Sequence, residues 1–228
     1  NGAKVVISNL SFQGFNNKKV LFVRCSNPQI LLGDVAKKIY KKKPQNIIGV
    51  TGTNGKTSIN NFYYQILKNN KKSVASIGTL GVISKKLKMK TNNTTVSVIN
   101  IHKILDKLKS LKVNNVILEA SSHGLKQLRL NGINFNTAIF TNLTRDHLDY
   151  HKTYKDYLNS KLILFNNLLN KNGNIIFSDD IPQAKYLNKI SKKKKLKRFI
   201  VGSYKSFFYI LKIQKIGEQK KVDFSFNN

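Results

Sequence analysis

The chain has 228 residues, 40% of them hydrophobic, and its 41 Lys and Arg against 10 Asp and Glu give a formal net charge of +31. This length can bury a core in one large or two small domains, and no apolar run approaches the ~20 residues of a membrane span. The single cysteine, Cys25, excludes an internal disulfide, and no signal-peptide pattern opens the chain, so we expect a cytoplasmic protein with no membrane partner.

Apolar runs recur along the chain, and helical patterns lie between most of them. One such pattern places Val98, Ile101, Leu105 and Leu108 at helical spacing. The alternation predicts an α/β fold with a mostly parallel sheet and helices on both faces, in which ligands gather at the carboxyl ends of the strands. The predicted strands are residues 4–7, 20–23, 46–50, 74–77, 115–118, 137–140, 174–177 and 199–201.

A basic, proline-containing stretch at 41–44 separates a predicted helix from the strand at 46–50. It predicts a domain boundary, with residues 1–43 in one domain and 44–228 in a second. The first segment is too short for an independent domain. We therefore expect it to be the closing part of an N-terminal α/β domain whose beginning is missing.

The stretch IGVTGTNGKTSINNFY, residues 48–63, carries the first chemical signal. A strand that enters a helix through a glycine-bearing loop is an anion cradle, because free backbone N–H groups and the positive end of the helix dipole converge there. Gly52 and Gly55 permit the tight backbone, Lys56 can reach a phosphate, and the Thr57 hydroxyl can ligate Mg²⁺. The common phosphate-loop pattern has glycine where Val50 stands, so a plain helix-starting turn is the alternative. We predict a nucleoside triphosphate ligand and a helix from Thr57 onward with these apolar residues at helical spacing: Ile59, Phe62, Tyr63, Ile66 and Leu67.

Two later strand ends carry acidic side chains. The strand at 115–118 runs directly into Glu119, where a metal bound to nucleotide phosphates would lie, although a solvated strand end is the plainer interpretation. The strand at 137–140 is followed by a denser cluster than a turn needs: Asp146, His147, Asp149 and His151. Both patterns favour a metal site at this edge of the sheet.

Lys161 interrupts the apolar face of the predicted helix in TYKDYLNSKLILF. The usual explanation is a lysine that extends its amine to solvent. A desolvated lysine loses its proton more readily, and the neutral amine can then react with carbon dioxide to form a carbamate. Such a carbamate would convert a cation into an oxygen ligand for Mg²⁺.

Lysine clusters at 41–44 and 191–198 could bind nucleic acid. Lysine is abundant along the whole chain, however, and aromatic residues are not interleaved with the basic runs as a single-strand binder would require. We therefore interpret these clusters as solvated faces and expect no nucleic-acid partner. A basic nucleic-acid-binding module remains the alternative from another functional class.

Four blocks resemble the Mur ligase family, and within it the MurE type. They are GVTGTNGKTS at 49–58, LEASSHGLKQLRLNG at 118–132, TNLTRDHLDYH at 141–151 and YLNSKLILF at 157–165. The resemblance extends from about Ala36 to about Phe177. It implies an ATP-dependent amide ligase of bacterial peptidoglycan synthesis, which adds a third amino acid to UDP-MurNAc-L-Ala-D-Glu through an acyl phosphate.

The resemblance also implies roles for individual residues. Lys56, His147 and Lys161 would be catalytic, with Lys56 stabilising charge on the transferring phosphoryl group. Thr57 and Glu119 match ligands of one Mg²⁺, and Glu119, His147 and carbamylated Lys161 match those of a second. The implied contacts of ATP are Gly52, Thr53, Asn54, Gly55, Lys56, Thr57 and Ser58.

For the UDP-MurNAc-dipeptide, the family's contacts fall on Asn93, Thr94, Thr95, Ser121, Gln127 and Arg129. Hydroxyls and amides suit a sugar and a peptide, and a guanidinium suits a carboxylate or diphosphate. A plain polar loop is the alternative for TNNTT at 91–95, because Val96 stands where the family usually has proline. We interpret His123 as a structural turn residue.

The resemblance weakens at both ends of the chain. Residues 1–43 match only the closing part of the family's N-terminal uridine-binding domain, and the family's C-terminal domain lies beyond Asn228. We therefore expect a monomer that is inactive by itself and whose parent adds meso-diaminopimelate or L-lysine. Folylpolyglutamate synthetase, which shares a similar loop and carbamylated lysine, is the alternative within the superfamily.

Overall fold

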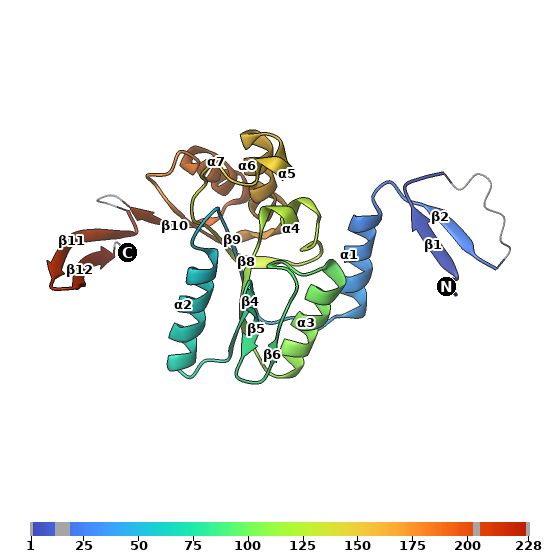
Figure 1. The fold of residues 1–228 in the computed structure, drawn as a ribbon, viewed down its shortest axis with the longest axis horizontal. Coiled ribbons are helices and arrows are strands. Elements are labelled where there is room, and N and C mark those ends of the chain that lie inside the picture. The colour runs from blue at the N-terminus through green and yellow to red at the C-terminus, as the bar shows by residue number, and fades with distance from the viewer. Residues whose placement is uncertain (1, 12–18, 203–205, 227–228) are drawn as a thin grey trace.

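A computed structural model describes residues 2–11, 19–202 and 206–226, and its centre is a ten-stranded sheet (Figure 1). The strand order is β12-β11-β10-β9-β8-β3-β7-β4-β5-β6. Neighbours from β10 to β4 pair in parallel, and β5, β6 and β12 add antiparallel edges. The strands are β3 Asn46–Thr51, β4 Val74–Gly78, β5 Gly81–Ser84, β6 Lys88–Met89, β7 Asn115–Glu119, β8 Phe135–Phe140, β9 Leu169–Ser178, β10 Lys197–Gly202, β11 Phe208–Ile216 and β12 Gln219–Phe226. This confirms the predicted α/β class with a mostly parallel sheet.

The central strands are covered on both faces. Every residue of β4 is buried although successive side chains point to opposite faces, which is typical of a parallel strand between two helical layers. The helices are α1 Pro28–Ile39, α2 Lys56–Asn69, α3 Val98–Ser110, α4 Ser122–Lys126, α5 Leu148–His151, α6 Tyr154–Ile163 and α7 Ala184–Lys194, with a π-helical turn η1 at Leu164–Leu168. No described helix is both long and apolar enough to cross a membrane.

The register of three strands builds one functional edge. Val50 of β3 lies opposite Glu119 of β7 on one side and Ile139 of β8 on the other. The segments that follow these three strands therefore leave the sheet side by side. Figure 1 shows α4, α5 and α6 above this edge.

Two helices test the predicted apolar stripes. Val98, Ile101, Leu105 and Leu108 of α3 are all buried, as the helical spacing indicated. The helix predicted at α2 is confirmed, but its apolar stripe is covered only in part, because Phe62 and Ile66 are 61% and 60% exposed. Ile59, Tyr63 and Leu67 are partly buried, and the polar Asn60 is the buried residue of that helix. Asn60 is tolerated there because its amide donates to Ile77 O at 3.0 Å.

The N-terminal segment forms a separate two-stranded parallel sheet, β1 Val5–Ser8 and β2 Leu21–Arg24, at one end of the molecule (Figure 1). Helix α1 joins it to the central sheet and packs on α3. Lys43, in the linker after α1, places its ammonium 2.8 Å from Nδ1 of the buried His102. The linker is therefore attached to the central body, and the domain boundary at 41–44 stays a prediction.

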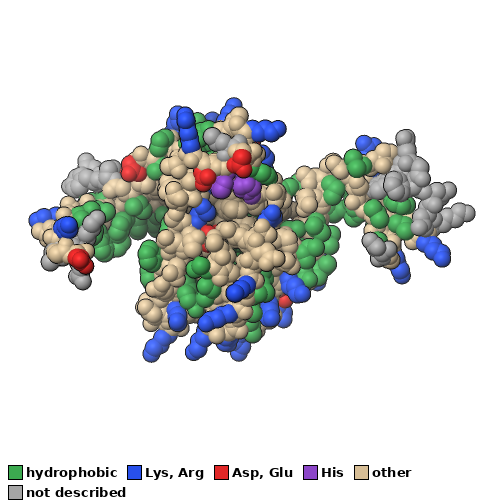
Figure 2. Space-filling view, viewed as in Figure 1, with side chains coloured by type: hydrophobic (Ala, Val, Ile, Leu, Met, Phe, Trp, Pro, Cys, Tyr) green, Lys and Arg blue, Asp and Glu red, His purple; other side chains and the backbone are tan. Residues whose placement is uncertain are grey.

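Each basic cluster contains one lysine that is partly buried and bonded to the body, which corrects part of the prediction. Lys43 is half-buried, and its desolvation lowers its pKa to about 8. Lys194 donates to the carbonyl oxygens of Phe165, Asn166 and Leu169. On the face shown in Figure 2, Lys and Arg side chains are otherwise scattered over the body.

Candidate active site

The glycine loop after β3 is held by the segment after β8. Gly52 has φ +150°, and a Cβ there would lie 1.8 Å from Thr141 Oγ1, so a side chain is excluded. Thr53 N donates to Asn142 O at 3.0 Å, and Asn54 N donates to Asn142 Oδ1 at 3.0 Å. Two of the loop amides predicted to face an anion are therefore occupied by Asn142, a residue to which the sequence had assigned no role.

Helix α2 begins at Lys56, one residue earlier than predicted, with Gly55 as its N-cap at φ +85°. Gly55 has no side chain that could cap the helix, so the first backbone N–H groups of α2 point out of its end. Ser58 follows in this first turn. The end of α2 is thus suited to an anion, as the sequence predicted.

Two lysine amines converge on one loop carbonyl. Lys56 Nζ donates to Gly52 O at 2.9 Å and Thr53 O at 2.7 Å, and Lys161 Nζ donates to Gly52 O at 2.8 Å. Lys161 is only 1% exposed and its amine lies 4.3 Å from the centre of the Tyr157 ring. The amine is therefore buried and does not extend to solvent.

Burial and the neighbouring charges weaken proton binding at both amines. Burial, with the nearby Lys56 ammonium acting in the same direction, lowers the pKa of Lys161 to about 7. Burial also lowers the pKa of Lys56, although Glu119 and Asp146 oppose that shift. A substantial fraction of Lys161 is consequently neutral near pH 7.

Glu119 is buried at the end of β7, 2% exposed, and not a solvated strand end. Its Oε2 accepts from Thr57 Oγ1 at 3.0 Å and from Thr79 Oγ1 at 3.2 Å, and its Oε1 accepts from Thr79 N at 3.0 Å. Gly78 makes room for the carboxylate, since a Cβ there would lie 2.1 Å from Oε1. The structure thus brings Thr57 and Glu119 together, and it adds Thr79, for which the sequence had no signal.

His147 lies on the exposed segment between β8 and α5. Its backbone has φ +52°, its Nε2 is 3.4 Å from Asp146 Oδ2, and its ring centre is 6.1 Å from that of Tyr157. Histidine side chains appear on this face next to acidic ones (Figure 2). Across residues 2–11, 19–202 and 206–226, no three His, Cys, Asp or Glu side chains are grouped so that they could hold a metal. The second predicted Mg²⁺ set therefore depends on Lys161 as a ligand.

His123 lies in helix α4 and not in a turn, which corrects the prediction. Its ring packs against those of His147, Tyr150 and His151, at centre distances of 5.0, 4.0 and 5.4 Å. Burial lowers the pKa of His123, and His147 adds to that effect. His123 is thus part of an aromatic cluster that joins α4 to α5.

The predicted muropeptide residues lie together, but several of their polar groups have structural partners. Thr95 Oγ1 donates to Glu119 O at 2.8 Å and accepts from Ser121 N at 3.0 Å, and Ser121 Oγ caps α4 through Gly124 N at 3.1 Å. Arg129 Nη1 donates to Thr95 O at 2.8 Å, and Arg129 Nε donates to Gln127 Oε1 at 2.9 Å. Thr94 Oγ1 is 3.1 Å from the Thr79 hydroxyl that also contacts Glu119. The loop is thereby connected to the acidic end of β7.

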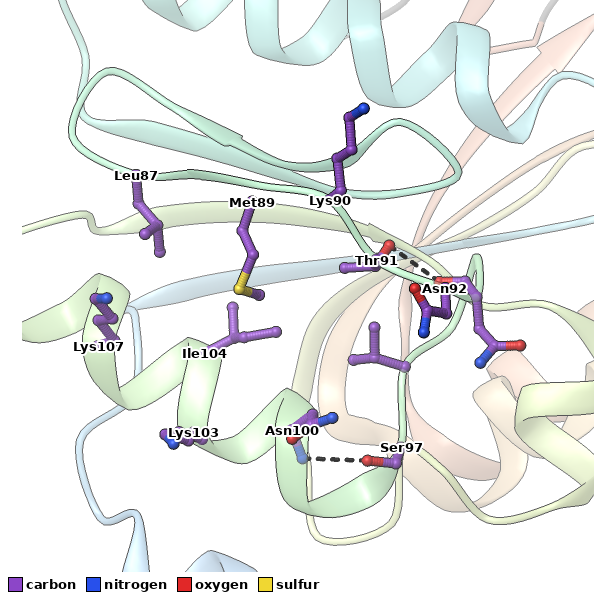
Figure 3. A pocket seen from close by; sticks show the side chains of 12 residues that line it. Leu87, Met89, Lys90, Thr91, Asn92, Ser97, Asn100, Lys103, Ile104 and Lys107 are labelled. Atoms are coloured by element: carbon purple, nitrogen blue, oxygen red, sulfur yellow. Dashed lines mark hydrogen bonds between the residues drawn. The ribbon is translucent and has the colours of Figure 1, made fainter.

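Two cavities flank the loop at residues 91–95. One, of about 450 Å³, is lined by Asn93, Gln127 and Arg129 together with α1 and the start of α3. The other, of about 490 Å³, lies between β6 and α3, where Met89 points toward Ile104 while Lys90 points away (Figure 3). Of these two cavities, only the one of about 450 Å³ is lined by several of the predicted muropeptide residues.

Tyr157 is a third residue, after Asn142 and Thr79, that sequence analysis did not assign to the site. Its hydroxyl is 3.1 Å from Thr53 Oγ1 in the glycine loop, and burial raises its pKa. In the sequence Tyr157 belongs to the apolar stripe of α6, which indicates burial but not the loop contact. The tyrosine thus connects α6 to the loop.

Known proteins share this sequence and fold. The pattern of the family described as Mur ligase middle domain matches residues 50–227. The UDP-N-acetylmuramoyl-L-alanyl-D-glutamate--2,6-diaminopimelate ligase of Rhizobium meliloti (strain 1021) is 42% identical over 68% of this chain and 32% of that protein. The ligase of the same name from Rickettsia montanensis is 37% identical over 92% of this chain and 44% of that protein. A solved structure of a ligase of that name has a TM-score of 0.81 and 28% identity, covering 96% of this chain and 45% of that one. The chain thus spans a third to a half of the length of these relatives.

Proposed function

The chain belongs to the Mur ligase family, and we propose that it forms the ATP-binding part of the ligase that adds the third amino acid to UDP-MurNAc-L-Ala-D-Glu. The family match and the names of the two relatives support this assignment. The observation that carries it is the convergence of Lys56, Lys161 and the Thr57–Glu119 hydrogen bond at the loop between β3 and α2. The protein acts on small molecules, as a cytoplasmic monomer.

In the proposed reaction, the substrate carboxylate attacks the γ-phosphate of ATP, which forms an acyl phosphate and releases ADP. The amine of the incoming amino acid then attacks the acyl carbon and displaces phosphate. The loop from Gly52 to Ser58 holds the triphosphate at the N-terminus of α2. The Lys56 ammonium, now bonded to Gly52 O and Thr53 O, exchanges these carbonyls for phosphate oxygens and stabilises the transferring group.

The residues around Glu119 fit a magnesium ion. A carboxylate and a hydroxyl, 3.0 Å apart at Thr57 and Glu119, form the oxygen donor set that Mg²⁺ prefers. Thr57 and Glu119 would hold one ion, and Glu119, His147 and carbamylated Lys161 a second. Bound Mg²⁺ would screen the repulsion between the substrate carboxylate and the polyphosphate.

The environment of Lys161 favours a carbamate. The amine is buried, and its pKa near 7 leaves a large neutral fraction that can attack carbon dioxide. Formation of the N–C bond from the neutral amine releases one proton. Together with the proton that the ammonium loses first, two protons leave when the carbamate anion replaces the cation. The new oxygens would supply the third ligand that the neighbouring His, Asp and Glu side chains do not provide.

The cavity of about 450 Å³ is the proposed site of the muropeptide. Asn93, Gln127 and Arg129 line it, and Arg129 presents a guanidinium to a carboxylate or diphosphate. Both relatives are named for 2,6-diaminopimelate. We therefore propose this amino acid, and not L-lysine, as the second substrate.

The test is ADP release by the full-length protein with UDP-MurNAc-L-Ala-D-Glu, Mg²⁺ and bicarbonate. meso-Diaminopimelate and L-lysine are compared as acceptors, with a folate and glutamate as the control for the related synthetase reaction. We expect release that requires the muropeptide and meso-diaminopimelate. Turnover with the folate, or with neither substrate, would overturn the proposal.

A matched pair of variants tests the site itself. Lys56→Met removes the loop ammonium, and Lys68→Met removes an exposed one from the last turn of the same helix. Loss of a charge-assisted phosphate contact predicts about 30-fold weaker Mg-ATP binding for Lys56→Met and no change for Lys68→Met. Equal effects in both variants would mean that general charge, and not this loop, attracts the nucleotide.

A further inference from the structure

His151 is a buried histidine at the junction of α4, α5 and α6, and the proposed reaction does not use it. Its ring is 0% exposed. Nε2 lies 2.9 Å from Ser122 Oγ on α4, and Nδ1 lies 3.5 Å from Asp156 Oδ2 and 3.4 Å from Ser160 Oγ on α6. Both ring nitrogens of this α5 residue therefore face other helices.

The partners determine which nitrogen carries the proton. The Ser160 hydroxyl donates to Asp156 O at 2.8 Å, so Ser160 Oγ can only accept from the imidazole. The Asp156 carboxylate is also an acceptor, which places the proton on Nδ1. Nε2 is then free to accept, and the Ser122 hydroxyl donates to it. Burial lowers the pKa of His151, although Asp156 opposes the shift, and this favours the neutral ring.

On one side, His151 contacts Tyr157, which in turn contacts the glycine loop. Its ring centre lies 5.0 Å from that of Tyr157, whose hydroxyl is 3.1 Å from Thr53 Oγ1. The same Tyr157 ring lies under the amine of Lys161. Contacts of His151 with α6 are thus contacts with the helix that carries Lys161.

On the other side, His151 contacts Ser122 of α4, the helix flanked by the predicted muropeptide residues Ser121 and Gln127. Ser122 is the first residue of α4, Ser121 is its N-cap and Gln127 its C-cap. Gln127 Nε2 also donates to Tyr150 OH at 3.1 Å, one residue before His151. A displacement of α4 relative to α6 would therefore move Ser121 and Gln127 away from the phosphate end of the site.

We propose that His151 is a positioning residue: by accepting the Ser122 hydroxyl it holds α4, with Ser121 and Gln127, in register with α6 and the glycine loop. It touches neither ATP nor the muropeptide. This inference rests on the proposed function, because it assigns the two sides of His151 to the two substrates of that reaction.

Two substitutions distinguish the hydrogen-bonding roles of the two ring nitrogens of His151. His151→Gln carries an amide oxygen that can accept from Ser122, whereas His151→Asn can donate to Asp156 but is too short to reach α4. We expect His151→Asn to raise the KM for the muropeptide about tenfold, the effect of one lost buried hydrogen bond, and to change the KM for ATP less than about twofold. His151→Gln should recover most of the loss. Ser122→Ala should reproduce His151→Asn, and the double variant should be no worse than either single one.

His102→Asn is the matched control. His102 is also 0% exposed and bonded at both nitrogens, to Lys43 Nζ and to Asn131 O, but it lies on α3. Both variants should lower the melting temperature, and only His151→Asn should change the muropeptide KM. Equal effects in the two variants, an equal rise in both KM values, or no recovery in His151→Gln would refute the positioning role.

Amide hydrogen exchange provides a readout that does not require turnover. Residues 122–126 should exchange about tenfold faster in His151→Asn than in the wild type, with little change in His151→Gln or His102→Asn. If the protein does not turn over the muropeptide, the proposed function fails, while exchange in α4 still decides whether His151 holds this helix. Unchanged exchange in His151→Asn would overturn the inference.

Discussion

Replacing Lys161 with methionine should make the fold more stable at neutral pH, in a way that depends on pH. The amine has a pKa of about 7 in the folded chain against 10.5 for an ordinary lysine. Between these values the unfolded chain binds more protons than the folded one, so the contribution of Lys161 to stability rises with pH across this window. Below pH 7 the amine is protonated in both the folded and the unfolded chain, so the full free-energy cost of burying its charge remains.

The size of this stability cost follows from the two pKa values of Lys161, in the folded and in the unfolded chain. They differ by 3.5, and at about 1.4 kcal/mol for each tenfold step in proton affinity the cost is about 5 kcal/mol below pH 7 and about 4 kcal/mol at pH 7. Lys161→Met keeps most of the buried stem but loses the hydrogen bond to Gly52 O and the contact with the Tyr157 ring, together worth about 1 to 2 kcal/mol. The variant should therefore be about 2 to 3 kcal/mol more stable at pH 7, and this gain should vanish by about pH 10.

Urea unfolding followed by circular dichroism, at steps between pH 7 and 10 in buffers free of carbon dioxide, measures this difference. Lys155→Met, which removes an exposed lysine from the same helix, is the control and should show no such trend. Lys43, whose pKa is also lowered, is present in both chains and is not among the groups that shift Lys161, so its contribution cancels in the difference. A stability difference that stays constant with pH, or a variant less stable at pH 7, would refute the burial argument.

Three further predictions concern the same site and the core. Bicarbonate should raise the melting temperature of the wild type in the presence of Mg²⁺ and give a carbamate carbon signal in NMR with ¹³C-bicarbonate, and neither effect should appear in Lys161→Met; a signal that survives the substitution would place the modification elsewhere. Gly78→Ala should displace the Glu119 carboxylate, because its Cβ would lie 2.1 Å from Oε1, and should weaken Mg-ATP binding about tenfold or more by titration calorimetry; unchanged affinity would argue against Glu119 as a ligand. Leu105→Ala should cost about 3 kcal/mol, or roughly 10 °C in melting temperature by scanning calorimetry, since Leu105 is 0% exposed in the core; a loss near zero would mean that the core collapses around the cavity.

The apolar runs were sufficient to predict the central strands. β3, β4, β7 and β8 are buried on both faces, and a strand in that position must be apolar throughout, so its signal is local. The β5, β6, β11 and β12 strands were not predicted. Met89, Ile210 and Phe224 in β6, β11 and β12 are exposed, so burial imposes little pattern on those three strands. β5 is largely buried but has only four residues, so its apolar run is too short to give a clear signal.

The glycine loop and the acidic strand ends could also be recognised from sequence, because backbone geometry and metal chemistry restrict the residue types there. The amphipathic pattern of α2 did not predict which of its apolar residues are buried, since Phe62 and Ile66 follow helical spacing but face solvent. Periodicity shows that a helix has an apolar side, and it does not show which side another element covers.

Whether Glu119 and Lys161 are buried was decided by tertiary structure alone. In sequence each has a plain alternative, a solvated strand end or an amine extended to water, and the choice depends on residues far along the chain. Thr79 and Thr57 enclose the carboxylate, and Gly52 and Tyr157 enclose the amine. The sequence by itself determined which residue types stand at the carboxyl ends of the strands. Only the packing of α2 and α6 over that edge excluded water, and desolvation is what lowers the pKa of Lys161.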